Sequence, residues 1–309
     1  MSALCIEPGS RLFRVKDLQG KIHEFSSYLV REALTGDGIL FPEDLEVMDS
    51  PPQVVELWPW ECGGAVRDFA LAGIYLGLLK KRFSQMFRRS EWRVVLSPHL
   101  LASQSQVWGA LLREASVRKF QLISNLECLS WQRVEEEPGL FLHWGTGGGD
   151  LGVCLQGETY RYQRLLVGED ILAVQLRDWI GQKIGQPVLK DEVYRLLRVV
   201  SATGLAFPGG RLVEIGVGGH ASPLRVSLEQ EVLLQAILSF MHPQLELIEG
   251  FVRGLSADDQ AALFGHGLQL SGGGVVLKLL GDCLQEIFEF PVVVLESPGH
   301  SVLSSHRLR

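Results

Sequence analysis

The chain has 309 residues, long enough for two domains with full cores, and 46% of them are hydrophobic. Its net charge of −7 argues against non-specific binding of nucleic acid, which needs a basic face. The five cysteines have no CxxC or CxxH spacing, so neither a zinc site nor a disulfide framework is expected. No apolar run approaches the ~20 residues of a membrane span, and no signal peptide is visible. We expect a cytosolic protein.

The first half alternates apolar runs with turn signals. Leu4 to Val15 has the pattern of two short strands around the turn Pro8–Ser10. A turn-rich, partly acidic stretch follows, which suits a small inserted subdomain. After it the apolar periodicity predicts a helix, a buried strand and a second helix: 69–79, 94–96 and 107–115.

The second half begins after a charged break at 135–139. Its apolar periodicity predicts helices at 171–184, at 190–201 and, after a glycine-rich strand-like stretch, at 228–241. Strands that alternate with helices predict an α/β architecture.

Glycine-rich turns are the most informative local feature. Gly267 to Pro298 reads as a strand, three glycines at 272–274, an amphipathic helix and a buried strand at Pro291–Leu295. Glycines let the backbone approach a ligand closely, and a helix N-terminus attracts phosphate. A second turn, 145–149, joins two strands in a hairpin whose tip could wrap phosphate oxygens. The same turns also fit tight structural connections, so they allow a nucleotide without requiring one.

The order and spacing of several motifs resemble MreB, the bacterial actin homologue, over nearly the whole chain. WPWECGGAVRDFALAGIYLGLLKK, from Trp58, resembles the family's RPL-DG-IADF segment, and WRVVLSPHLL, from Trp92, resembles its RVVVCVPSG strand. FQLISNLECL, from Phe120, takes the place of the LIEEPMAAA turn. LLVGEDILAVQL, from Leu165, is similar to the GGDEFD helix, and the segment from Gly267 is similar to the strand-TGGG-helix-PVVV adenosine motif.

This resemblance implies an α/β actin-like ATPase fold. Two related halves, each with a mixed sheet flanked by helices, would face each other across a nucleotide cleft. The first half is expected at 1–140, with the inserted subdomain at about 23–57. The second half is expected at 141–298, with a small subdomain at about 171–226, and 299–309 would return to the first half.

The resemblance implies that ATP is the cofactor, and it also implies which residues contact the ATP. The expected nucleotide-binding residues come from four segments: Gly9, Ser10, Arg11, Leu12, Gly145, Thr146, Gly147, Gly148, Asp191, Glu192, Val193, Tyr194, Gly272, Gly273, Gly274 and Val275. The catalytic candidates are Glu7 and His143, at the places of two aspartates that direct magnesium in the family, and Gln104, which matches the residue that holds the attacking water.

The sequence departs from the family where the metal chemistry takes place. Pro8 removes an N–H from the first hairpin, and His143 puts an imidazole where hydrated magnesium needs oxygen. Tyr194 replaces a lysine that contacts the ribose in the family. The histidines are far apart in the sequence, so no metal ligands are predicted. We therefore expect the chain to bind ATP, and these residues do not support a bound magnesium ion. We expect at most slow ATP turnover.

The function implied is that of a cytoskeletal protein that binds ATP, forms filaments with copies of itself and lies at the inner membrane, where it organises cell shape and wall synthesis. The cell-wall or division machinery would supply its partners. The alternative is a degenerate, non-hydrolysing scaffold or adaptor. A third possibility is an adaptor of the FtsA-like or PilM-like branch, and the FtsA-like one is disfavoured because SSHRLR is not the terminal amphipathic helix of that branch. A DnaK-type chaperone is disfavoured because no substrate domain follows.

Membrane contact is expected through Phe83–Trp92, at the position of the family's membrane-binding loop. This segment mixes basic residues with Phe83, Met86, Phe87 and Trp92, a composition that suits an anionic lipid surface. The alternative is a helix end whose aromatic side chains pack inward. Three other tryptophans are predicted to be core residues: Trp58, Trp60 and Trp108.

Overall fold

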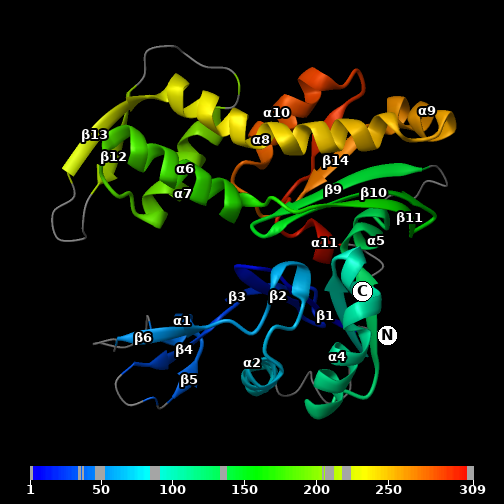
Figure 1. Cartoon of the computed structure of the whole chain (residues 1–309). Helices are drawn as coiled ribbons and strands as arrows, with labels where there is room; N and C mark the ends of the chain where they lie inside the picture. Colours follow the sequence, from blue (N-terminus) through cyan, green and yellow to red (C-terminus); the bar gives the residue numbers. More distant parts are fainter. Residues whose placement is uncertain are drawn as a thin grey trace. The chain divides into compact units, whose positions relative to one another are not determined.

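The chain folds into two compact units, which are described separately. The computed structural model describes residues 3–33, 36, 38–45, 53–83, 91–132, 138–203, 205, 212–217 and 224–304. The first unit comprises Met1–Glu136, Cys154–Tyr162 and His300–Arg309, and the second comprises Glu137–Val153 and Gln163–Gly299. Figure 1 labels the helices and strands of both units.

A five-stranded sheet forms the centre of the first unit, in the order β3-β2-β1-β7-β8. Its strands are β1 (Ala3–Pro8), β2 (Leu12–Lys16), β3 (Ile22–Ser26), β7 (Glu91–Leu96) and β8 (Phe120–Ser124). β1 pairs antiparallel with β2 and parallel with β7, so the sheet is mixed, as predicted. All six residues of β1 are buried, because both faces of the sheet are covered.

Side chains alternate between the two faces of this sheet. Phe13 of β2 lies on the apolar face, 4.8 Å from the ring of Tyr75 in α2 (Phe69–Arg82). Trp108 of α4 (Leu101–Glu114) stacks on Trp60 at 5.1 Å, and both are buried, which confirms that they are core residues. Trp58 is only partly buried and stacks on Tyr28 instead.

Two short helices contact other strands of the first unit. They are α5 (Asn125–Ser130), which contacts β7, and α11 (Ser301–Ser304), which contacts β1. The Lys16 Nζ donates to the Leu303 carbonyl over 2.7 Å, so the end of the described chain is anchored on β2.

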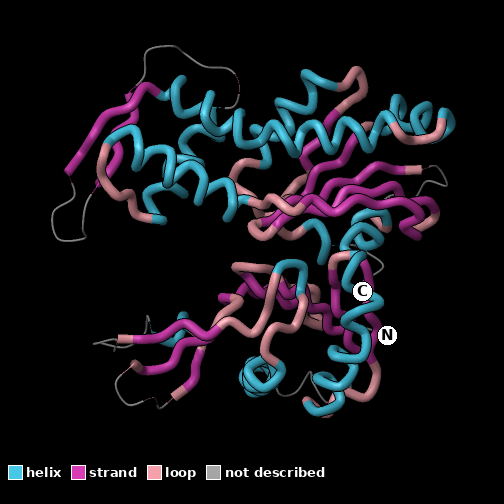
Figure 2. Tube along the Cα trace, viewed as in Figure 1, coloured by secondary structure: helices cyan, strands magenta, loops and turns pink. Residues whose placement is uncertain are grey.

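A three-stranded sheet, β5-β4-β6, forms the smaller part of the first unit. Its elements are β4 (Leu29–Glu32), β5 (Ile39–Leu40), β6 (Val54–Leu57) and the short α1 (Pro42–Leu45). Figure 2 shows these strands beside the longer strands of the unit. β3 pairs with β2 in the main sheet, so the small sheet begins later than the expected boundary at about residue 23. Two single turns of 3₁₀ helix complete this unit: η1 (Cys62–Gly64) and η2 (Pro98–Leu100).

The second unit also has a five-stranded sheet, in the order β11-β10-β9-β14-β15. The strands are β9 (Gly139–Gly145), β10 (Gly148–Leu155), β11 (Glu158–Leu165), β14 (Leu268–Ser271) and β15 (Val292–Val294). A separate ribbon is formed by β12 (Leu212–Val217) and β13 (Leu224–Glu229). The helices are α6 (Glu169–Ile184), α7 (Lys190–Thr203), α8 (Gln230–Arg253), α9 (Ala257–His266) and α10 (Leu277–Ile287).

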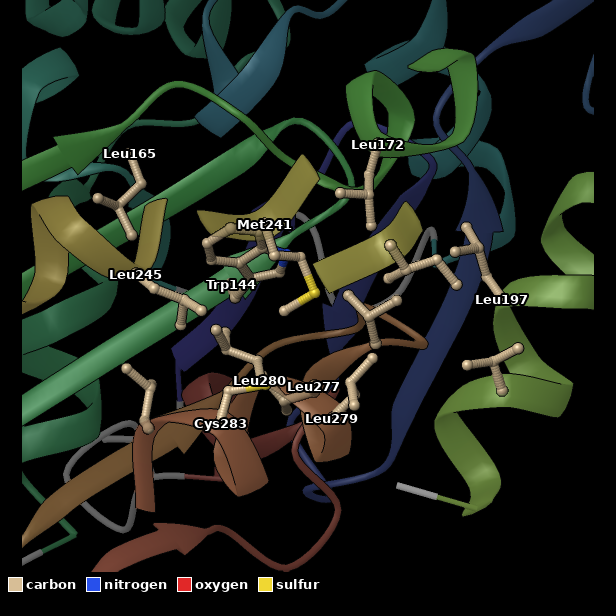
Figure 3. Packing of buried hydrophobic residues seen from close by; sticks show 14 of the residues in the cluster. Trp144, Leu165, Leu172, Leu197, Met241, Leu245, Leu277, Leu279, Leu280 and Cys283 are labelled. Atoms are coloured by element: carbon tan, nitrogen blue, oxygen red, sulfur yellow. The ribbon is translucent and has the colours of Figure 1, made fainter. Parts of the chain in front are cut away.

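The hydrophobic core of the second unit joins this sheet to the helices. Figure 3 shows Trp144 of β9 among Met241 and Leu245 of α8 and Leu280 of α10. Trp144 and Met241 are completely buried. Mixed sheets flanked by helices thus confirm the predicted α/β class.

Three expectations about packing were wrong. α8 does not end at residue 241 but continues through Pro243 to Arg253, because buried residues such as Ile248 extend its apolar face beyond the proline. The strand expected to be buried at 291–295 is an edge strand, and Val293 and Val294 are 46% and 39% exposed.

The third correction concerns the segment expected at the membrane. Phe83 and Trp92 are 9% and 0% exposed and belong to the core of the first unit, so neither is a surface anchor. Met86 and Phe87 lie in 84–90, outside the described residues. Among the helices that the structure describes, none combines the length and apolar character needed to cross a membrane.

Candidate functional site

Two glycine turns of the second unit leave the same edge of its sheet. β9 and β14 are parallel neighbours, with His143 opposite Ser271. The hairpin turn after β9 and the turn 272–276 after β14 therefore both follow the carboxyl ends of adjacent strands. In open α/β sheets this edge is where ligands bind.

The glycines of the second turn have different roles. Gly272 has φ +120°, and a Cβ there would lie 1.8 Å from the Trp144 carbonyl oxygen, so its lack of a side chain is required by the contact with β9. Its N–H donates to the Pro298 carbonyl over 2.8 Å. Gly273 is exposed and Gly274 is partly exposed. The backbone that a ligand could approach is therefore at Gly273 and Gly274.

The start of α6 packs against the hairpin turn. A Cβ at Gly168 would lie 2.1 Å from the Gly148 nitrogen and 2.4 Å from the Thr146 carbonyl oxygen. The Asp170 N–H donates to that same carbonyl over 2.9 Å. The first turn of α6 thus fixes the position of the predicted residues Gly145–Gly148.

Glu169 connects this helix to the second turn. Its side chain is nearly completely buried, and its Oε1 accepts a hydrogen bond from the Val275 N–H over 2.8 Å. α6 therefore holds both glycine turns, one through Gly168 and Asp170 and the other through Glu169. Our sequence reasoning missed Glu169, although its place as the first residue of a helix directly after a glycine was a usable signal.

An ion pair between the buried Asp150 and the partly exposed Arg164 supports the base of the hairpin. The Arg164 Nη1 donates to the Gly149 carbonyl and to the Asp150 Oδ1, each over 3.1 Å. Asp150 is only 1% exposed. Neither residue was predicted, because the pair depends on which residues of β10 and β11 lie side by side.

The predicted ribose-binding residues of α7 serve mainly its packing. Val193 and Tyr194 are buried, and the Tyr194 hydroxyl donates to Asp170 in the first turn of α6. Glu192 accepts from the Gly216 N–H over 2.8 Å and lines a cavity of about 640 Å³ beside the β12–β13 ribbon. Asp191 is exposed on the rim of that cavity. Of the four, only Tyr194 is linked to the hairpin turn, through Asp170.

The hairpin of the first unit is closed by its own backbone. The Gly9 N–H donates to the Leu12 carbonyl over 3.1 Å, and the Ser27 N–H donates to the Arg11 carbonyl over 2.9 Å. The Ser27 hydroxyl also donates to the Gly9 carbonyl. Ser10 and Arg11 are partly exposed at the turn.

Each of the three catalytic candidates contacts another residue of its own unit. In the first unit, Glu7 lies 3.6 Å from the Arg14 Nη1, and the Gln104 Oε1 accepts from the Val66 N–H over 3.1 Å. In the second unit, the His143 Nδ1 lies 2.9 Å from the Ser271 hydroxyl. Within the described part of the chain, no group of three or more histidine, cysteine or acidic side chains could hold a metal ion.

Comparison with known proteins was made at the level of sequence and of structure. No family model matches the chain. The cell shape-determining protein Mbl of Bacillus cereus is 22% identical over 166 residues, 51% of this chain, and the chain spans about half (48%) of the length of that curated relative. MreB5 of Spiroplasma citri bound to ADP has a TM-score of 0.84 at 12% identity, over 99% of this chain and 94% of that one.

The chain has the actin-like fold of the MreB proteins. The actin-like fold is also found in the MamK double helical filament, which has a TM-score of 0.77 at 14% identity over 98% of this chain and 97% of that one. The resemblance to MreB that the motifs indicated is thereby confirmed for the fold.

Proposed function

We propose that the chain is an MreB-like cytoskeletal protein that binds ATP and assembles with copies of itself into filaments. The observation that carries this proposal is the actin-like fold over 99% of the chain, with a TM-score of 0.85 to MreB5 of Spiroplasma citri bound to AMPPNP. The matched MamK structure is a filament, and Mbl is a cell shape-determining protein. A role in cell shape and wall synthesis is part of the proposal.

The chain's own residues fit a nucleotide at the glycine turns. Gly273 and Gly274 offer accessible backbone beside the start of α10, and without a Cβ a ligand can approach this backbone closely. The hairpin turn Gly145–Gly148 is held on α6 through the Thr146 carbonyl, and Gly145, Thr146 and Gly147 remain partly exposed. We assign the phosphates to the hairpin turns and the adenosine to the turn at Gly273.

Slow or absent ATP turnover is part of this proposal. Phosphoryl transfer depends on positioned charges more than on covalent chemistry. Glu7 faces a guanidinium, His143 faces a hydroxyl, and Gln104 accepts from the backbone, so none of the three is held ready for water or metal by its neighbours. These contacts also favour the second candidate, a non-hydrolysing scaffold or adaptor.

We place the protein in the cytoplasm, at the inner face of the membrane, with the cell-wall or division machinery as partner. Phe83 and Trp92 are core residues and do not support membrane contact. The support for the membrane comes from the basic residues in the sequence of 84–90 and from the family resemblance.

The experiment that tests ATP binding compares two glycine variants by calorimetric titration. Gly273→Val puts a branched side chain on the exposed turn and should abolish binding. Gly250→Val is the matched control, because Gly250 is an exposed glycine of α8 with no atom within 4 Å of its Cβ position. If Gly273→Val binds ATP as tightly as the parent chain does, the assigned turn is wrong.

A further inference from the structure

Glu7 is the carboxylate that the actin-like fold would use to direct hydrated magnesium, and it already has a cation beside it. Glu7 of β1 and Arg14 of β2 are directly opposite in the antiparallel register. The Arg14 Nη1 lies 3.6 Å from the Glu7 Oε2, and each side chain is only 9% exposed. A guanidinium stays protonated in proteins, so Arg14 places a permanent positive charge beside Glu7.

Arg14 is held in this position from its other side as well. It is opposite Glu24 of β3, and its Nε donates to the Glu24 Oε1 over 2.9 Å. The His300 Nε2 lies 3.1 Å from the same oxygen. Burial alone would lower the pKa of Arg14, but attraction to Glu7 and the hydrogen bond to Glu24 raise it above its ordinary value. The three strands thus carry a fixed row of acid, base and acid.

His143 stands at the other position where the family has a magnesium-directing aspartate, and it fits magnesium no better than Glu7 does. Magnesium requires oxygen ligands or water held by oxygen, whereas His143 presents an imidazole whose Nδ1 is 2.9 Å from the Ser271 hydroxyl. The Arg14 guanidinium also lies beside the Glu7 carboxylate, so a hydrated dication would have to compete with it for Glu7. The residues at both positions therefore do not fit the metal that the fold family implies.

We propose that the chain binds ATP without magnesium, because Arg14 supplies within the sheet the positive charge that balances Glu7. The inference rests on the proposed function, ATP binding. Arg11, at the turn of the same hairpin, is a second cation close in sequence to the phosphates' assigned place.

The test is a calorimetric titration of the full chain with ATP, in excess EDTA and in millimolar magnesium. The dissociation constants should agree within about threefold. Binding that is about tenfold or more tighter with magnesium overturns the inference and leaves the proposed function intact. Absence of binding in both buffers overturns both.

Variants show whether Arg14 is the cause. Arg14→Met removes the cation and keeps the apolar stem, so magnesium should then tighten ATP binding by about tenfold. Arg31→Met is the matched control, because Arg31 is an exposed arginine on β4, and it should stay insensitive to magnesium. If Arg14→Met folds and also stays insensitive, Arg14 is not the counter-ion. His143→Asp leaves Arg14 beside Glu7, so its ATP binding should stay insensitive to magnesium. Magnesium-dependent binding by His143→Asp alone would show that Arg14 is not the cause and would contradict the account.

Discussion

Gly272→Ala tests whether the shape of the second glycine turn comes from its packing on β9. At φ +120° an alanine is strained by about 1–3 kcal/mol. The added Cβ would lie 1.8 Å from the Trp144 carbonyl oxygen, and only a shift of backbone can relieve that contact. Such a shift would break the 2.8 Å hydrogen bond from Gly272 to Pro298, worth about 1 kcal/mol. We expect a total loss of roughly 2–4 kcal/mol in the free energy of unfolding.

Thermal unfolding followed by circular dichroism measures this effect. For a domain of 150–250 residues, such a loss lowers Tm by roughly 10 °C. Gly250→Ala is the control with the opposite sign, because an alanine at this exposed position in the last turn of α8 should stabilise the helix by up to about 1 kcal/mol. If Gly272→Ala unfolds at the parent's temperature, the close contact with Trp144 is not a feature of the folded protein.

Three further predictions follow from individual residues. Glu169→Ala should weaken ATP binding by about tenfold or more in calorimetric titration, because the Val275 N–H loses its side-chain acceptor. Glu169→Gln keeps an acceptor and should lose less affinity for ATP. Equal affinities in the parent and both variants would refute the role of Glu169. Ellman's reagent at pH 8 should modify one thiol in the native protein and five after unfolding. The reason is that Cys62 is exposed, whereas burial raises the pKa of the Cys5 and Cys283 thiols to about 11. Two or more rapidly modified thiols in the native protein would contradict the burial of the other cysteines. Burial alone would raise the pKa of Asp17, but hydrogen bonds with His23 and from two backbone N–H groups lower it. The stabilisation by ionised Asp17 is therefore present above about pH 4 and is lost as the pH falls toward the pKa of the folded state. The Tm difference between the parent and Asp17→Asn should shrink below about pH 4, and a constant difference would contradict this prediction.

The sequence was sufficient for the class of fold because periodicity and motif order do not depend on atomic detail. The two hairpins and the strand–turn–helix at Gly267–Pro298 form as expected. Burial was harder to predict where the place of an element in the sheet decides it. β15 is a run of valines, yet it is an edge strand, and its valines are exposed for that reason. Phe83 and Trp92 looked like surface anchors beside basic residues, yet both fill the core.

The candidate site was predictable only in part. The glycine turns could be found because a run of glycines between a strand and a helix stands out in the sequence. The pairing of Glu7 with Arg14 could not, because it requires the register of β1 and β2, which is set by the length of the turn between them. The same holds for Glu169 and Val275, which are far apart in the sequence. The remaining nucleotide contacts, including those of Asp191 and Val275, stay predictions.

The central claim, an actin-like filament protein that uses ATP, is tested most directly by electron microscopy of the purified chain with and without AMPPNP. The account predicts filaments that depend on the nucleotide and that are lost in Gly273→Val while Gly250→Val still forms them. A chain that binds ATP yet stays monomeric at every concentration tested would contradict the filament claim and would favour the adaptor.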